Sequence, residues 1–160
     1  MKKKTICLAG LIMVMMVCLT IYFQPMSLSD SISETGRIHI TITEMNVQDG
    51  DPHMDFTDYN DMTEEQKGRM VALLENYPYR RSFHTIFSDG SISGLGDKML
   101  SIFVYQDTEL IHSIAVSSEG QVAIDDRTYE MKHAELFIEQ IESICNQQKQ
   151  GLQSTEQGST

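Results

Sequence analysis

The chain has 160 residues, of which 23 are Asp or Glu and 12 are Lys or Arg, so its formal net charge is −11. Residues 1–23 carry three of the basic side chains and none of the acidic ones, which leaves a net charge of −14 on the rest. Since binding to phosphate backbones and anionic headgroups depends on Lys and Arg, this charge argues against nucleic acid and anionic membrane surfaces as partners. It is typical of a soluble, monomeric domain, and it would also attract divalent cations or basic polymers.

Residues 1–23 predict an export signal. Lys2, Lys3 and Lys4 precede 19 uncharged, mostly apolar residues from Thr5 to Phe23. Lysines before an apolar run stay on the cytoplasmic side while the run enters the bilayer. The run is longer than the roughly 7–15 residues of a secretory signal and close to the roughly 20 that span a membrane. We therefore expect a single-pass anchor with the rest of the chain outside the cytoplasm.

Residues 24–36 predict a polar tether, because serines are frequent here and Pro25 interrupts helical structure. Ser27 and Ser29 also place small residues where a signal peptidase reads the chain. Cleavage after Ser29, followed by secretion, is therefore the alternative to a retained anchor.

Residues 37–146 predict one extracytoplasmic domain, and the polar residues 147–160 predict a disordered tail. The domain begins with a strand at 38–43, where Ile alternates with His and Thr. After an acidic connector, Thr63 and Gln66 have capping-box spacing and begin a helix that ends at Tyr77, before Pro78.

Several strands and a final helix complete the predicted domain. Short turn-forming connections favour antiparallel pairing of the strands, which we expect at 83–87, 99–105, 110–116, 121–124 and 127–131. The last helix covers 133–146, and its predicted buried side comprises Leu136, Phe137, Ile141, Ile144 and Cys145. We therefore predict an α+β fold, in which two helices pack on one face of an antiparallel meander of five to six strands.

The acidic connector is the strongest candidate for a metal site. Calcium takes six to eight oxygen ligands, and Asp49, Asp51 and Asp55 are spaced so that several carboxylates could contribute. The pattern departs from the helix-loop-helix calcium motif, since Met54 stands where Gly is needed and Asn60 where Glu is needed. A solvated connector in which Asp serves as a turn residue is the alternative.

Other motifs point to structure more than to chemistry. Gly90, Gly94 and Gly96 suggest a phosphate-binding loop, but a strand pattern follows where such a loop needs a helix. His39 and His112 lie in predicted strands and could meet across the sheet. We find no serine-hydrolase motif, no catalytic residue and no cofactor motif in the sequence.

The order of segments resembles small exported domains of unknown function from Gram-positive bacteria. The likeness lies in the lysine-led apolar segment, the tether, RIHITITEM, the acidic connector, the helix and RTYEMKHAELFIEQI. It covers residues 37–145 at the level of element order. It implies export or membrane anchoring and assigns no functional residue.

Three functions follow as hypotheses. The first is a non-enzymatic binding domain displayed outside the membrane, with a protein of the cell envelope as its partner. The second is an acidic inhibitor or sensor module that acts on a basic partner in the envelope. The third is a small envelope hydrolase, which would require a deep pocket with ionisable groups of perturbed pKa.

Overall fold

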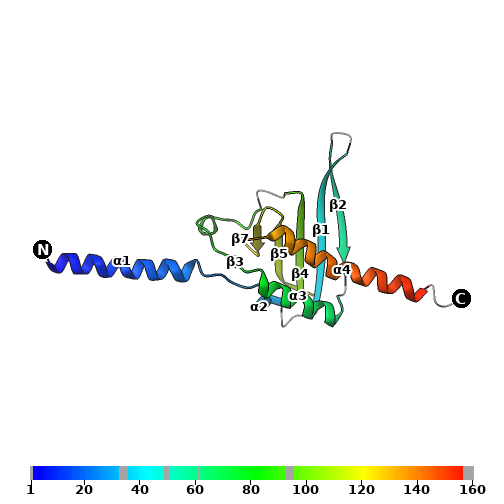
Figure 1. The fold of residues 1–160 in the computed structure, drawn as a ribbon, viewed down its shortest axis with the longest axis horizontal. Helices are drawn as coiled ribbons and strands as arrows, with labels where there is room; N and C mark the ends of the chain where they lie inside the picture. Colours follow the sequence, from blue (N-terminus) through cyan, green and yellow to red (C-terminus); the bar gives the residue numbers. More distant parts are fainter. Residues whose placement is uncertain (1, 33–35, 49–50, 61, 93–95, 157–160) are drawn as a thin grey trace.

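The computed structural model describes residues 2–32, 36–48, 51–60, 62–92 and 96–156 (Figure 1). A long N-terminal helix leads into an α+β domain in which helices lie across a twisted sheet. The elements, in chain order, are α1 Lys2–Tyr22, α2 Ser29–Ile32, β1 Arg37–Gln48, β2 Asp51–Tyr59, α3 Glu64–Asn76, β3 Tyr79–Arg80, the 3-10 helix η1 His84–Ile86, β4 Lys98–Gln106, β5 Glu109–Ser117, β6 Gln121–Ile124, β7 Arg127–Met131 and α4 Ala134–Glu156.

The sheet is antiparallel throughout and has the strand order β2-β1-β4-β5-β6-β7-β3. The predicted α+β class is confirmed, and so is the β4 to β7 meander. The predicted number of strands is wrong, because the sheet has seven strands. The additional pairings come from β2 and β3, which form the two edges.

The acidic connector is a strand and not the loop that we predicted. β2 pairs with β1 from Ile40 opposite Tyr59 to Gln48 opposite Asp51. Since β1 pairs with β4 only as far as Glu44, the two strands continue beyond the sheet as a ribbon, which projects from the domain in Figure 1. The many Asp residues concealed this strand, because Asp is depleted in strands and common in turns.

The predicted strand at 83–87 is also wrong. This segment contains η1, in which the Thr85 amide lies 3.2 Å from the Ser82 carbonyl that accepts its hydrogen bond. The Thr85 hydroxyl also accepts a 2.9 Å hydrogen bond from the Ser82 amide. These local bonds close a turn where the apolar residues suggested an extended chain.

One face of the sheet carries the core. Ile38, Ile40 and Ile42 of β1 are buried, as the alternation predicted, and they pack with buried residues of β4, β5, α3 and α4. On α4, Phe137, Ile141, Ile144 and Cys145 are buried as expected, whereas Leu136 is 50% exposed. The backbone of α4 continues past Asn146 to Glu156, so the helix is longer than the predicted range 133–146.

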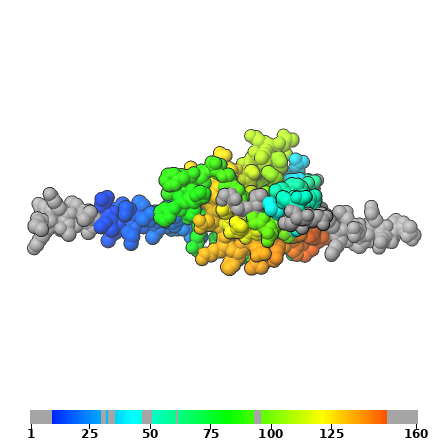
Figure 2. Space-filling view, turned by 90° about the horizontal axis from the view of Figure 1, so that it is seen from above, coloured from blue at the N-terminus to red at the C-terminus, as the bar shows by residue number. Residues whose placement is uncertain are grey.

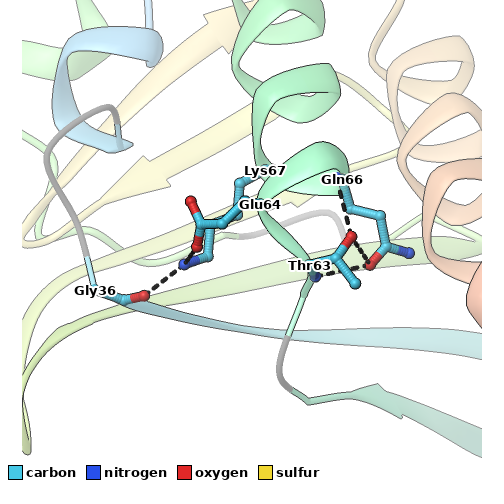
Figure 3. Close-up of polar contacts among 5 residues, drawn as sticks. All are labelled: Gly36, Thr63, Glu64, Gln66 and Lys67. Atoms are coloured by element: carbon cyan, nitrogen blue, oxygen red, sulfur yellow. Dashed lines mark hydrogen bonds and ion pairs between the residues drawn. The ribbon is translucent and has the colours of Figure 1, made fainter.

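The start of α3 follows the predicted capping box. The Gln66 amide donates to the Thr63 hydroxyl, while the Gln66 side chain accepts from the Thr63 amide at 3.0 Å (Figure 3). On the next turn, the Lys67 ammonium lies 2.7 Å from the Glu64 carboxylate and 2.6 Å from the carbonyl of Gly36. This contact connects α3 to the chain just before β1.

Residues 24–36, which we predicted as a polar tether, contact the domain in their described part. Met26 exchanges two backbone hydrogen bonds with Tyr79 of β3, at 2.9 and 3.0 Å. Leu28 is 0% exposed and Ile32 is 2% exposed, and both belong to the core. The described part of this segment is therefore integrated into the domain that follows α1.

The helix α1 projects away from the sheet (Figure 1). From Leu11 to Ile21 its large apolar side chains are exposed. Over the part of the chain whose side chains are described, no helix is both long enough and apolar enough to cross a membrane.

Candidate functional site

Two of the three aspartates of the predicted calcium site lie on β2. Asp49 lies outside the described residues. Asp51 and Asp55 are exposed on β2, and Asp55 accepts a 3.1 Å hydrogen bond from Asn46 and lies 3.3 Å from His53. Among the residues that the structure describes, no group of three or more His, Cys, Asp or Glu side chains is placed to hold a metal ion.

A cleft lined by acidic side chains lies where β1 and β4 meet α4. We name it the acidic cleft; it has a volume of about 520 Å³. Its charged lining consists of Glu44, Asp97, Lys98, Glu119, Glu135 and Glu139. Five carboxylates and one ammonium give it a negative potential that favours cationic ligands.

Lys98 is the one cation among the described residues of this lining. Its ammonium lies 2.5 Å from Glu44 and 2.9 Å from Glu142 of α4, and so bridges the sheet to the helix. Burial lowers the pKa of Lys98, but hydrogen bonds and charge from Glu142 and Glu44 outweigh burial and raise the pKa above its ordinary value. Lys98 is thus paired with Glu44 and Glu142, and it remains charged at neutral pH.

The other four acidic groups of the cleft are not neutralised in this way. Within the described ranges, no Lys, Arg or His lies at ion-pair distance from Asp97, Glu119, Glu135 or Glu139. Carboxylates accept charge-assisted hydrogen bonds from ammonium and guanidinium groups. The arrangement can therefore hold a basic side chain or an amine.

An apolar groove adjoins the cleft on the opposite face of the sheet. We name it the methionine groove; it has a volume of about 100 Å³ and includes Met45, Met54, Phe56 and Met99. Phe56 is 65% exposed, and Met45 and Lys98 also line the acidic cleft. A ligand that combines basic and apolar groups would contact both surfaces around this edge.

Sequence reasoning missed both surfaces. Glu135 and Glu139 are one helical turn apart, which is a local signal for a shared helix face. Glu44 and Glu119, in contrast, are brought to that face only by the pairing of β1 with β4 and β4 with β5. No spacing in the sequence reveals that arrangement.

The remaining predicted motifs have structural environments. Gly90 has a φ of +79°, and a Cβ there would lie 2.9 Å from the Asp125 carbonyl oxygen, so glycine fits this loop against the β6–β7 turn. His39 contacts Asp58 of β2, whereas His112 contacts Asp125. The two histidines do not meet, because β4 separates their strands.

Cys145 is buried at 1% exposure, as predicted. Burial, with a smaller effect from the charge of Glu142, raises its pKa from 9.0 to about 11. The thiol is therefore protonated at neutral pH and a poor nucleophile.

No protein-family model, curated protein or solved structure matches the chain.

Proposed function

We propose that the protein is a non-enzymatic binding domain held at the outer surface of a membrane by α1. The lysine-led run of residues 2–23 supports this topology, since its charges stay in the cytoplasm. The exposure of the large apolar side chains between Leu11 and Ile21 supports it too, because such a surface needs an apolar cover.

The observation that carries the proposal is the continuity between α1 and the core. Only a few residues separate Tyr22 from Met26, whose backbone bonds join β3, and the buried Leu28 follows. Cleavage after Ser29 would remove both the Met26 pairing and the Leu28 side chain from the domain. The packing thus favours retention of α1 over secretion.

Cysteine labelling of intact bacterial cells that express the full chain tests this topology. We expect a membrane-impermeant maleimide to label a Glu65→Cys variant in intact cells, because Glu65 is exposed on α3. A Lys3→Cys variant should react with the maleimide only after lysis. Cys145 should remain unlabelled in both variants because it is buried. Labelling in the reverse order, or release of the protein from membranes by alkaline carbonate, would contradict the proposal.

A second candidate function is recognition of a basic partner in the cell envelope, as an inhibitor or sensor would require. The acidic cleft supports it, since four of its carboxylates lack a cationic neighbour among the described residues. The adjoining methionine groove suits apolar side chains next to the basic ones. The partner segment would therefore combine Lys or Arg with apolar residues.

A synthetic peptide of alternating Lys and Leu serves as the probe for this second function. The double variant Glu135→Gln, Glu139→Gln should weaken peptide binding severalfold and reduce its salt dependence. The double variant Glu64→Gln, Glu65→Gln removes the same charge from α3 and is the matched control. Equal weakening in both variants would show that only net charge matters and would contradict a site in the cleft.

A further inference from the structure

The loop around η1 exposes apolar side chains in an unusual way. Phe83 is 70%, Ile86 is 53% and Phe87 is 87% exposed, whereas the polar Thr85 between them is buried. A loop of a soluble domain ordinarily has the opposite arrangement. We name these three apolar residues the aromatic face.

Hydrogen bonds hold the loop in this orientation. The Thr85 hydroxyl accepts from the Ser82 amide, and the Ser88 hydroxyl donates to the Thr85 carbonyl at 3.2 Å. The same Ser88 oxygen accepts a 2.9 Å hydrogen bond from the amide of Thr128 on β7. The loop is thus fixed to the sheet through its polar groups, and its apolar groups are directed outward.

The aromatic face lies beside the C-terminal end of α1. The rings of Phe23 and Phe83 pack edge to face with centroids 5.0 Å apart. The guanidinium of Arg81 lies 5.2 Å from the centre of the Tyr22 ring. In Figure 2 this part of the chain is coloured green, and it lies next to the blue helix α1.

We propose that the aromatic face lies in the interfacial layer of the same bilayer that holds α1. This inference rests on the anchoring proposed above. Phe and aliphatic side chains of membrane-surface segments enter the boundary between headgroups and acyl chains, and the end of a spanning helix must lie near that level. Because Phe83 contacts Phe23 directly, the position of α1 fixes the depth of the loop as well.

The local charge agrees with this placement despite the acidic character of the domain. Arg80 and Arg81 directly precede the loop, and a hollow lined by both of them also contains Phe23, Phe83 and Glu130. Arginine next to an apolar surface places its guanidinium among headgroup phosphates. The domain is thereby held against the membrane on one side, with the acidic cleft elsewhere on its surface.

Depth-dependent fluorescence quenching tests the inference in the full chain. The chain contains no Trp, so a single introduced Trp is the only indole that reports. Three variants, Leu11→Trp, Phe87→Trp and Phe56→Trp, are reconstituted separately into phosphatidylcholine vesicles with lipids brominated near the start or near the end of the acyl chain. Phe56→Trp is the matched control, since Phe56 is an exposed phenylalanine on β2.

Each outcome has a distinct meaning. We expect Leu11→Trp to be quenched most by deep bromines, Phe87→Trp most by shallow bromines, and Phe56→Trp by neither. If Leu11→Trp is quenched and Phe87→Trp is not, the aromatic face does not contact lipid and the inference fails while the anchor stands. Blue-shifted but unquenched emission from Phe87→Trp would show a protein cover and would also overturn it. An unquenched Leu11→Trp would instead refute the anchor.

Discussion

Gln66 shows how one side chain connects two helices. Its amide oxygen accepts from the Thr63 backbone at the start of α3, and its amide nitrogen donates at 3.0 Å to the Ile144 carbonyl of α4. The first contact follows from the capping-box spacing and could be predicted from sequence. The second contact joins residues far apart in the chain and could not.

Replacement of Gln66 by Ala should therefore cost more than the loss of a cap alone. We expect the free energy of unfolding to fall by about 1–3 kcal/mol, because the Gln66 half of the capping box and a buried hydrogen bond are both lost. Urea unfolding of the full chain in detergent measures this. Glu65→Ala on the exposed side of α3 is the control, and an equal loss there would contradict the linking role of Gln66.

Cys145 gives the protein a specific alkaline sensitivity. In the unfolded chain the thiol ionises near its ordinary pKa of 9.0, whereas in the folded domain its pKa is about 11. The folded state thus binds more protons between these values, and stability that is complete below pH 9 is lost as the pH rises toward 11. Raising the pH through this window should lower the free energy of unfolding by about 2–3 kcal/mol from this group.

The slope of stability against pH distinguishes this effect from general alkaline denaturation. A Cys145→Ala variant should lose less stability between pH 9 and 10.5 than the unchanged chain. A Cys18→Ala variant is the control, because Cys18 is exposed on α1. If the Cys145→Ala variant has the same slope as the unchanged chain, the raised pKa is wrong.

At the scale of elements, the helices and strands that depend on local patterns could be predicted from sequence. Those that depend on long-range packing could not. The alternation in β1, the cap of α3 and the turns between β4 and β7 are each determined by adjacent residues. The ribbon strand β2 and the buried segment around Leu28 depend on partners elsewhere in the chain. The acidic cleft could not be predicted for the same reason, since three separate elements line it.

Two leucines reverse their predicted roles and make a matched pair. Leu28 lies in the predicted tether but is fully buried, whereas Leu136 lies on the predicted buried side of the last helix but is half exposed. Leu28→Ala should lower the free energy of unfolding by about 2–5 kcal/mol, and Leu136→Ala by less than about 1 kcal/mol. Urea unfolding measures both losses, and a larger loss for Leu136→Ala would contradict the burial of Leu28.

Two glycines should respond to the same substitution with opposite signs. Gly68 lies within α3, and a Cβ added there would meet no atom within 4 Å, so Gly68→Ala should stabilise the domain by about 0.5–1 kcal/mol. Gly90 has a positive φ, and a Cβ there would lie 2.9 Å from backbone atoms, so Gly90→Ala should destabilise by more than about 1 kcal/mol. Thermal unfolding compares the two; a stabilising Gly90→Ala would contradict the loop geometry.

At the scale of the whole molecule, the end of α1 contacts the domain, to which we predicted a connection through a polar tether. The Met26 pairing with β3, the buried Leu28 and the contact of Phe23 with Phe83 connect the end of α1 to the domain. If α1 spans a bilayer as we propose, this connection would leave the domain little freedom to move away from the membrane. It would hold any binding surface, including the acidic cleft, at a fixed height above the bilayer.

The retention of α1 is the central claim, and the mass of the mature protein tests it most directly. Mass spectrometry of the protein from fractionated cells reads its N-terminus in the membrane and in the medium. We predict a membrane-bound protein that retains α1 together with Met26 and Leu28. A domain found in the medium with its N-terminus at Asp30 would contradict the claim, since it would have lost all three.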